Sequence, residues 1–251
     1  MTWWSELYND ALADVLLDGT SAAEIAATVD FLVERLALPE RGVVFDQCAG
    51  TGRLSIALAR RGYTVHAVEQ CAAYVERARA AAAGLDVVPS FVIGDAFEHV
   101  PARSCDGAFN WWTSFGYLPD DAGNARMLER AFEALVPGGR FALDLPNLPG
   151  VLASFRPHEI TRRGELTILR ETTLDLARGL MHKRWTFLDG TGRRVERPST
   201  VRVYMPDQIA SLLAAVGFTA VELVGGSDGQ PLGLHSPRCI AIAGRPPRDA
   251  R

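Results

Sequence analysis

Lysine is almost missing from this chain of 251 residues, in which Lys183 is the single lysine. Together with abundant alanine, this bias is typical of GC-rich coding DNA and indicates no function by itself. A basic surplus is also missing, because 30 acidic residues outnumber 26 basic ones and the formal net charge is −4. Such a chain lacks the positive field that attracts nucleic acid or anionic lipid. We therefore expect neither nucleic acid nor a membrane as a partner.

Cysteine pairs and long apolar runs are absent as well. The four cysteines form no C-x-x-C pair, and none has a histidine at metal-ligand spacing, so we predict reduced thiols and no metal site. No apolar stretch approaches the ~20 residues that span a bilayer. The first residues also lack the basic start and apolar run of a signal peptide. These absences predict a cytoplasmic protein.

Short apolar segments alternate with helical segments through the first half of the chain. We expect strands at 43–46, 64–69, 87–93, 106–110 and 140–145, and helices at 53–61, 72–83 and 122–136. A helix at 206–216 and strands at 218–224 and 239–243 resume the pattern. Continuous apolar strands separated by helices are typical of a parallel sheet that is covered on both faces. The sequence therefore predicts a doubly wound α/β fold within one domain, residues 1–251.

Two other segments flank this pattern. Before it, helices are expected at 4–17 and 21–38, and the second begins with the capping box Ser21 and Glu24. After the fifth strand, runs of β-branched and aromatic residues are expected as strands at 160–175, 180–188 and 193–204, separated by turns such as Asp189-Gly190. Asp-Gly between two such runs is typical of a hairpin. We predict an antiparallel β insertion over 150–205.

A glycine-rich loop follows the first strand, which ends at Asp46, and includes Gly50 and Gly52 before the next helix. Glycines there allow positive φ and let a ligand approach the backbone. Dinucleotide enzymes carry a similar loop, but the third glycine of their fingerprint is replaced by Ser55. Asp46 would also oppose a pyrophosphate at the helix N-terminus. The loop therefore favours a ligand that carries an ammonium and a sulfonium group.

Acidic residues stand at the ends of three consecutive predicted strands, namely Asp46, Glu69 and Asp95. Open α/β sheets bind ligands at the carboxyl ends of their strands, and an acid after the second strand can accept hydrogen bonds from both ribose hydroxyls. We therefore expect these three carboxylates to surround one ligand site.

With these motifs the sequence resembles the class I S-adenosylmethionine-dependent methyltransferases, most strongly over residues 30–147. Residues 46–52 are similar to the family's cofactor loop, Glu69 to its ribose-binding acid, and Asp95 to the acid that contacts the adenine amino group. Residues 135–140 are similar to the turn before the family's fifth strand. The resemblance implies the sheet order 3-2-1-4-5-7-6 for a seven-stranded, mostly parallel sheet with an antiparallel last strand. It also implies that the helices of residues 1–38 lie over the cofactor site.

The cofactor implied by the resemblance is S-adenosyl-L-methionine. The residues expected to bind it are Asp46, Gly50, Gly52, Glu69, Gln70, Asp95, Ala96 and Asn110. The implied activity is transfer of a methyl group to a nitrogen, oxygen or carbon atom of a small molecule. Two alternatives stay open, a non-catalytic S-adenosylmethionine-binding protein and a nucleotide-binding oxidoreductase. A monomer and a homodimer are equally compatible with the sequence.

The acceptor side is less defined by the sequence. Residues 110–117 lack the two prolines that family members acting on adenine or amide nitrogens usually carry after Asn or Asp, which disfavours nucleic-acid methylation. We expect Trp111 and Tyr117 to form a pocket wall, and Trp112 and Phe115 to lie in the core. No general base is assigned. Possible bases are Tyr117, His158, His182, Tyr204 and His235.

The predicted insertion is positively charged within an acidic chain. It holds eleven basic and six acidic residues, a surplus of five positive charges. Arginine suits bidentate recognition of a carboxylate or phosphate. We choose Arg202, near the return to the main fold, as the residue that binds such a group on the substrate.

Overall fold

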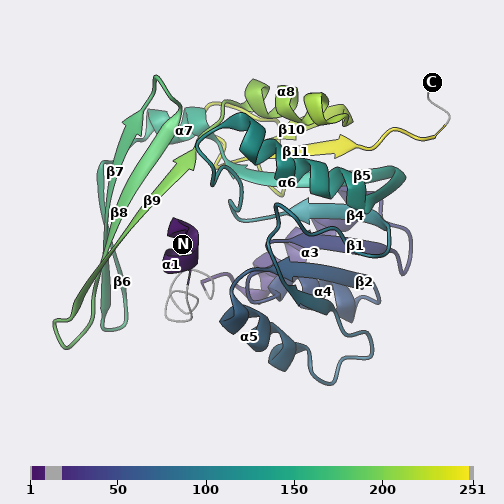
Figure 1. The fold of residues 1–251 in the computed structure, drawn as a ribbon, viewed down its shortest axis with the longest axis horizontal. Coiled ribbons are helices and arrows are strands. Elements are labelled where there is room, and N and C mark those ends of the chain that lie inside the picture. The colour runs from purple at the N-terminus through teal and green to yellow at the C-terminus, as the bar shows by residue number, and fades with distance from the viewer. Residues whose placement is uncertain (1, 9–18, 249–251) are drawn as a thin grey trace.

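The computed structural model describes residues 2–8 and 19–248 and arranges them around two β-sheets (Figure 1). The larger sheet has seven strands in the order β10-β11-β5-β4-β1-β2-β3. The strands are β1 (Val43–Gln47), β2 (Thr64–Glu69), β3 (Ser90–Ile93), β4 (Cys105–Asn110), β5 (Leu135–Pro146), β10 (Thr219–Val224) and β11 (Arg238–Gly244). Only β11 runs antiparallel to its neighbours. The predicted order and the antiparallel last strand are confirmed.

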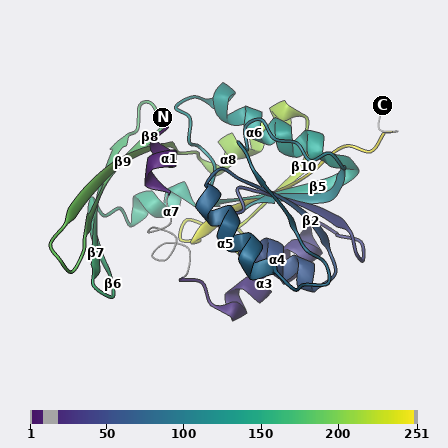
Figure 2. The same ribbon diagram turned by 60° about the horizontal axis from the view of Figure 1, so that its bottom comes forward.

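Helices cover both faces of this sheet, as Figure 2 shows. On one face lie α3 (Ala22–Arg35), α4 (Arg53–Arg60) and α5 (Ala72–Ala82), and on the other lie α6 (Asp121–Ala134) and α8 (Pro206–Val216). Every residue of β1 is buried, as expected for a central strand between two helical layers. The predicted doubly wound fold is therefore confirmed, and the strand ends meet at one edge of the sheet.

The smaller sheet is the predicted antiparallel insertion. It follows α7 (Leu148–Ala153) and consists of β6 (His158–Arg163), β7 (Leu166–Asp175), β8 (Leu180–Leu188) and β9 (Arg194–Arg202). The sequence suggested one continuous run over 160–175, but a turn divides it into β6 and β7. Gly164 allows this turn because its φ is 55°, a left-handed value that glycine adopts without strain. The sequence pattern also gave no sign of α7.

The N-terminal residues connect the two sheets. Helix α1 (Trp3–Leu7) lies between the insertion sheet and the larger sheet (Figure 1), and Leu7 is buried against Ile168 and Trp185 of the insertion. Most of the helix predicted at 4–17 falls outside the described residues. The second predicted helix is confirmed as α3 with its capping box, and it packs on the larger sheet. Within residues 2–8 and 19–248, no helix is long and apolar enough to cross a membrane.

Candidate functional site

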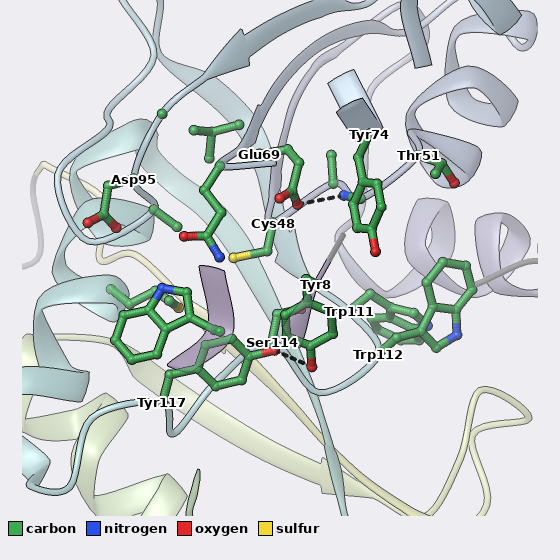
Figure 3. A pocket seen from close by; sticks show the side chains of 18 of the residues that line it. Tyr8, Cys48, Thr51, Glu69, Tyr74, Asp95, Trp111, Trp112, Ser114 and Tyr117 are labelled. Atoms are coloured by element: carbon green, nitrogen blue, oxygen red, sulfur yellow. Dashed lines mark hydrogen bonds between the residues drawn. The ribbon is translucent and has the colours of Figure 1, made fainter. Parts of the chain in front are cut away.

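A pocket opens at the carboxyl ends of β1, β2, β3 and β4 (Figure 3). Its empty volume, counted together with its opening to solvent, is about 810 Å³. The loop after β1 and the ends of β2 and β3 form one side. The segment after β4 and two aromatic residues near the N-terminus, Trp4 and Tyr8, form the other. The site thus lies where an open α/β sheet is expected to bind its ligand.

The loop after β1 is held to the end of β2 by backbone hydrogen bonds. The Ala49 amide donates to the Val68 carbonyl at 3.0 Å, and the Gly50 amide donates to Glu69 Oε2 at 3.0 Å. Cys48 and Gly50 both have left-handed φ values, 68° and 56°. These bonds turn the loop so that residues 48–51 line the pocket.

Gly52 has a different role from the predicted one. It does not line the pocket, and a Cβ on it would lie 2.7 Å from the Phe91 ring and 2.9 Å from Ala78 Cβ. Its φ of 74° is also a value that side chains rarely adopt. The glycine therefore permits close packing of the loop against β3 and α5, not close approach of a ligand.

Glu69 is the best-defined acid of the site. Its Oε1 accepts from the Cys71 amide at 2.8 Å and its Oε2 from the Gly50 amide, which fixes the carboxylate at the pocket wall (Figure 3). The Gln70 amide is a further backbone donor to this carboxylate. An ionised carboxylate offers about four acceptor positions, so some acceptor capacity is left for a ligand. Burial raises the pKa of Glu69, whereas the backbone amides oppose that shift.

Of the two other predicted acids, only Asp95 lines the pocket. It is exposed, and its Oδ1 accepts from the Phe97 amide at 2.9 Å. Asp46 lies beneath the loop, is 4% exposed, and accepts from the Ser55 hydroxyl at 2.6 Å. Burial raises the pKa of Asp46 to about 7, so it supplies less negative charge than the sequence suggested. Ser55, which stands where a dinucleotide fold has its third glycine, is thus the partner of a buried acid.

The remaining predicted cofactor residues divide in the same way. Gln70 and Ala96 line the pocket, whereas Asn110 is fully buried and does not. The Asn110 amide nitrogen donates to Gln47 Oε1 at 3.3 Å and to the Ser114 carbonyl at 3.4 Å. It therefore fixes the segment after β4 and does not reach the pocket itself.

That segment brings two adjacent tryptophans to the pocket. We expected Trp111 at the pocket and Trp112 in the core, but both line it. Strand alternation ends at Asn110, and Trp112 and Thr113 have left-handed φ values of 57° and 69°, so the two indoles do not point to opposite faces. The Arg53 guanidinium lies 4.4 Å from the Trp112 ring centroid. Phe115 is 2% exposed, and its core position is confirmed.

Tyr117 also lines the pocket, as expected, and it pairs with a residue that sequence reasoning missed. Its hydroxyl donates to the Tyr8 hydroxyl at 2.9 Å, and the two rings are stacked (Figure 3). Burial raises the pKa of both tyrosines above the ordinary value of a phenol. The i, i+4 spacing of Trp4 and Tyr8 was the available signal, because it places two aromatics on one face of a predicted helix.

Arg202, which we expected at the substrate, does not line this pocket. Its Nε donates to Asp121 Oδ1 at 3.1 Å, and its Nη1 donates to the Val203 carbonyl at 2.7 Å and the Gly179 carbonyl at 3.2 Å. The guanidinium is thus used to fasten the insertion to α6. Among the described residues, the pocket takes none of its lining from the insertion, and Tyr117 is the only suggested base that borders it.

Comparison with known proteins agrees with this architecture. Residues 44–139 match the family model of the methyltransferase domain. The CcbJ methyltransferase of Streptomyces caelestis superposes with a TM-score of 0.79 at 19% identity, over 94% of this chain and 96% of that one. The S-adenosylmethionine-bound amino pentose methyltransferase CalS10 of Micromonospora echinaspora gives 0.67 at 19% identity, over 95% and 97%.

A relative in sequence is the S-adenosyl-L-methionine-dependent Diels-Alderase iccD of Talaromyces variabilis. It is 31% identical over 117 residues, which are 43% of this chain and 37% of that protein. The match therefore spans little more than a third of the relative. The superpositions show that the chain has the fold of these methyltransferases, and residues 44–139 are similar to the methyltransferase domain.

Proposed function

We propose that this protein transfers the methyl group of S-adenosylmethionine to a nitrogen, oxygen or carbon atom of a small molecule. The observation that carries the proposal is the Glu69 carboxylate, which two backbone amides hold at the pocket wall with acceptor capacity left over. A carboxylate at this place, after the second strand, can accept hydrogen bonds from ribose hydroxyls.

The residues present fit this cofactor. Glu69 would accept hydrogen bonds from the ribose, and the exposed Asp95 would accept one from the adenine amino group. Residues 48–51 would border the methionine part, close to Arg53. When bound, the cofactor supplies a methyl group that its sulfonium already activates. The protein therefore has to orient an acceptor and exclude water.

The aromatic side of the pocket suits that task. Tyr8, Trp111 and Tyr117 lie across from Glu69 with flat apolar surfaces (Figure 3), and Trp4 lines the pocket beside Tyr117. Because Tyr117 donates its proton to Tyr8, the Tyr8 proton is left to donate to a group in the pocket. The raised pKa of both phenols keeps them neutral near pH 7, so they would orient an acceptor by hydrogen bonding and not act as a base.

The comparisons and the net charge of the chain support a small molecule as the acceptor. CalS10, which superposes on 95% of this chain, is an amino pentose methyltransferase, and this supports a small molecule as the acceptor here too. The net charge of −4 supports the same choice over nucleic acid.

The similarity to a Diels-Alderase favours a second candidate, a reaction that requires bound S-adenosylmethionine without consuming its methyl group. Incubation with methyl-labelled cofactor and a lysate of the source organism, followed by mass spectrometry, separates the two. We expect S-adenosylhomocysteine and a labelled small molecule, and less of both in Glu69→Ala at limiting cofactor. Cofactor that binds and stays intact would overturn methyl transfer in favour of the second candidate. Difference spectra with NADH test the remaining alternative, an oxidoreductase.

A further inference from the structure

The inner face of the insertion sheet carries an unusual set of charges. Trp185 of β8 pairs with Arg170 of β7 on one side and with Arg197 of β9 on the other. Lys183 lies two positions before Trp185, and therefore on the same face of the sheet. This is the face on which Leu7 of α1 packs. Three cationic side chains thus gather around one indole.

The distances show how close this cluster is. Arg170 Cζ lies 5.4 Å and Lys183 Nζ 5.8 Å from the Trp185 ring centroid. Arg170 also pairs with Glu159, and its Nε donates to Glu159 Oε2 at 3.0 Å. Arg197 donates a hydrogen bond from Nη1 to the Glu196 carbonyl, while its buried Nε has no hydrogen-bond partner among the described residues. Among the ion pairs of the described residues, Arg170–Glu159 is the one that involves this cluster.

Two buried hydroxyls complete the cluster. Thr172 and Ser199 are 6% and 5% exposed, and they are the cross-strand neighbours of Lys183. Ser199 Oγ accepts from Trp185 Nε1 at 2.9 Å, so its own proton can be donated to a third group. Arg170 is 31% exposed, which leaves the cluster open to solvent on that side.

The surroundings of Lys183 disfavour its charged form. The pKa of Lys183 is lowered to about 8, first by burial and then by the nearby Arg170, while Glu159 compensates only in part. A buried cation without enough opposite charge is unfavourable, and a bound anion would relieve that cost. Arginine and lysine together are well suited to a carboxylate or a phosphate.

We propose that Arg170, Lys183 and Arg197 form an anion-binding site that takes a carboxylate or phosphate group of the methyl acceptor. The assignment of the bound group to a methyl acceptor rests on the proposed function, whereas the anion site itself does not. Tyr8 joins the two sites, because it lines the pocket and also packs against the cluster of Leu7, Ile168 and Trp185. An acceptor held by its anionic group at the insertion would thus lie beside the Tyr8 wall.

The single lysine makes the first test specific. An amine-reactive reagent can modify only Lys183 and the N-terminal amine, and mass spectrometry distinguishes the two. We expect inorganic phosphate or acetate to slow the labelling of Lys183 saturably and to leave the N-terminal amine unchanged. Comparing the two anions shows whether the site prefers phosphate or carboxylate. Sodium chloride at the same ionic strength is the control. The proposal would be overturned if it slowed the labelling of Lys183 as much as phosphate or acetate does, or if these anions slowed both amines equally.

A second test uses variants and calorimetric titration with the same two anions. Lys183→Met and Arg197→Gln should each weaken the binding of the preferred anion by roughly 10- to 150-fold. The matched control is Arg184→Gln, because Arg184 lies on the opposite face of β8 and pairs with Glu171. Thermal unfolding curves show which variants are folded. No binding of either anion to the folded wild type, or the same loss in the control, would overturn the site. S-adenosylmethionine binding, measured separately, tests the proposed function.

Discussion

The hydroxyl oxygens of Tyr8 and Tyr117 lie 2.9 Å apart and join the N-terminal helix to the segment after β4. Tyr8→Phe removes the hydroxyl that is free to donate but keeps the ring. If this proton orients the acceptor, we expect kcat to fall by about 10- to 100-fold, since small errors of position are costly in methyl transfer. Calorimetry should show unchanged cofactor affinity. A variant with full turnover would exclude this role for Tyr8.

Glu69→Ala should weaken the binding of S-adenosylmethionine by roughly 10- to 150-fold, because a charged hydrogen bond contributes about 1.5–3 kcal/mol. NAD should bind hardly at all to the wild type. Glu76→Ala is the matched control, since Glu76 lies on the outer side of α5 and pairs with Arg79. Wild-type affinity in Glu69→Ala, measured by calorimetry, would remove the ribose role.

Trp111 serves the pocket and the core at once, because it is 6% exposed and its ring lies 5.9 Å from that of Phe31. Trp111→Ala should therefore lower the free energy of unfolding by about 3–5 kcal/mol. Trp111→Phe keeps much of the packing and is the better test of the pocket wall. We expect it to retain cofactor binding and to lose most turnover. Chemical denaturation and single-turnover kinetics measure the two effects, and unchanged turnover would place the acceptor elsewhere.

Arg202→Gln should reduce stability and leave the acceptor KM unchanged. The side chain is 13% exposed, and the variant loses the charged contacts that fasten the insertion to α6. A loss of about 1.5–3 kcal/mol in the free energy of unfolding is expected from such contacts. A raised KM at unchanged stability would instead return Arg202 to the substrate site.

Asp46 makes stability depend on pH in an unusual direction. Its folded-state pKa is raised from 3.8 to about 7, so between these values the folded protein holds a proton that the unfolded chain has released. Stability must then fall as pH rises through this range, by up to about 1.4 kcal/mol per pH unit. Asp46→Asn, which keeps an oxygen for Ser55, should remove this slope. Urea titrations of both proteins at pH 5 and pH 7 measure it, and equal slopes would contradict the assignment.

The sequence predicted the larger sheet well because its signals are local. Each strand is a short apolar run, and each helix has a capping residue or a terminal glycine, such as Ser21 or Gly217. Glu69 and Asp95 could be placed for the same reason, since Glu69 ends β2 and Asp95 lies two positions after β3, and the topology fixes the carboxyl ends of both strands.

The parts that were missed depend on contacts between distant residues. Asp46 and Gly52 were assigned to the ligand from the loop alone, but Ser55 and Phe91 determine their roles. The position of Trp112 depends on left-handed backbone conformations at Trp112 and Thr113, which no sequence pattern predicts. In the sequence, Arg202 cannot be distinguished from the arginines around Trp185. Its partners, Asp121 and two carbonyl oxygens, come close to it only in the folded chain.

Helix α1 contains five residues, fewer than the ~12–15 that an isolated helix needs to be stable in water. It is a helix because Leu7 is held by the insertion sheet and Trp4 by the core of the larger sheet. The pocket therefore depends on the insertion without taking a side chain from it. Local opening of the insertion should unwind α1 and open the pocket together, and the amide protons of Leu7 and Tyr8 should then exchange with solvent at the rate of that opening.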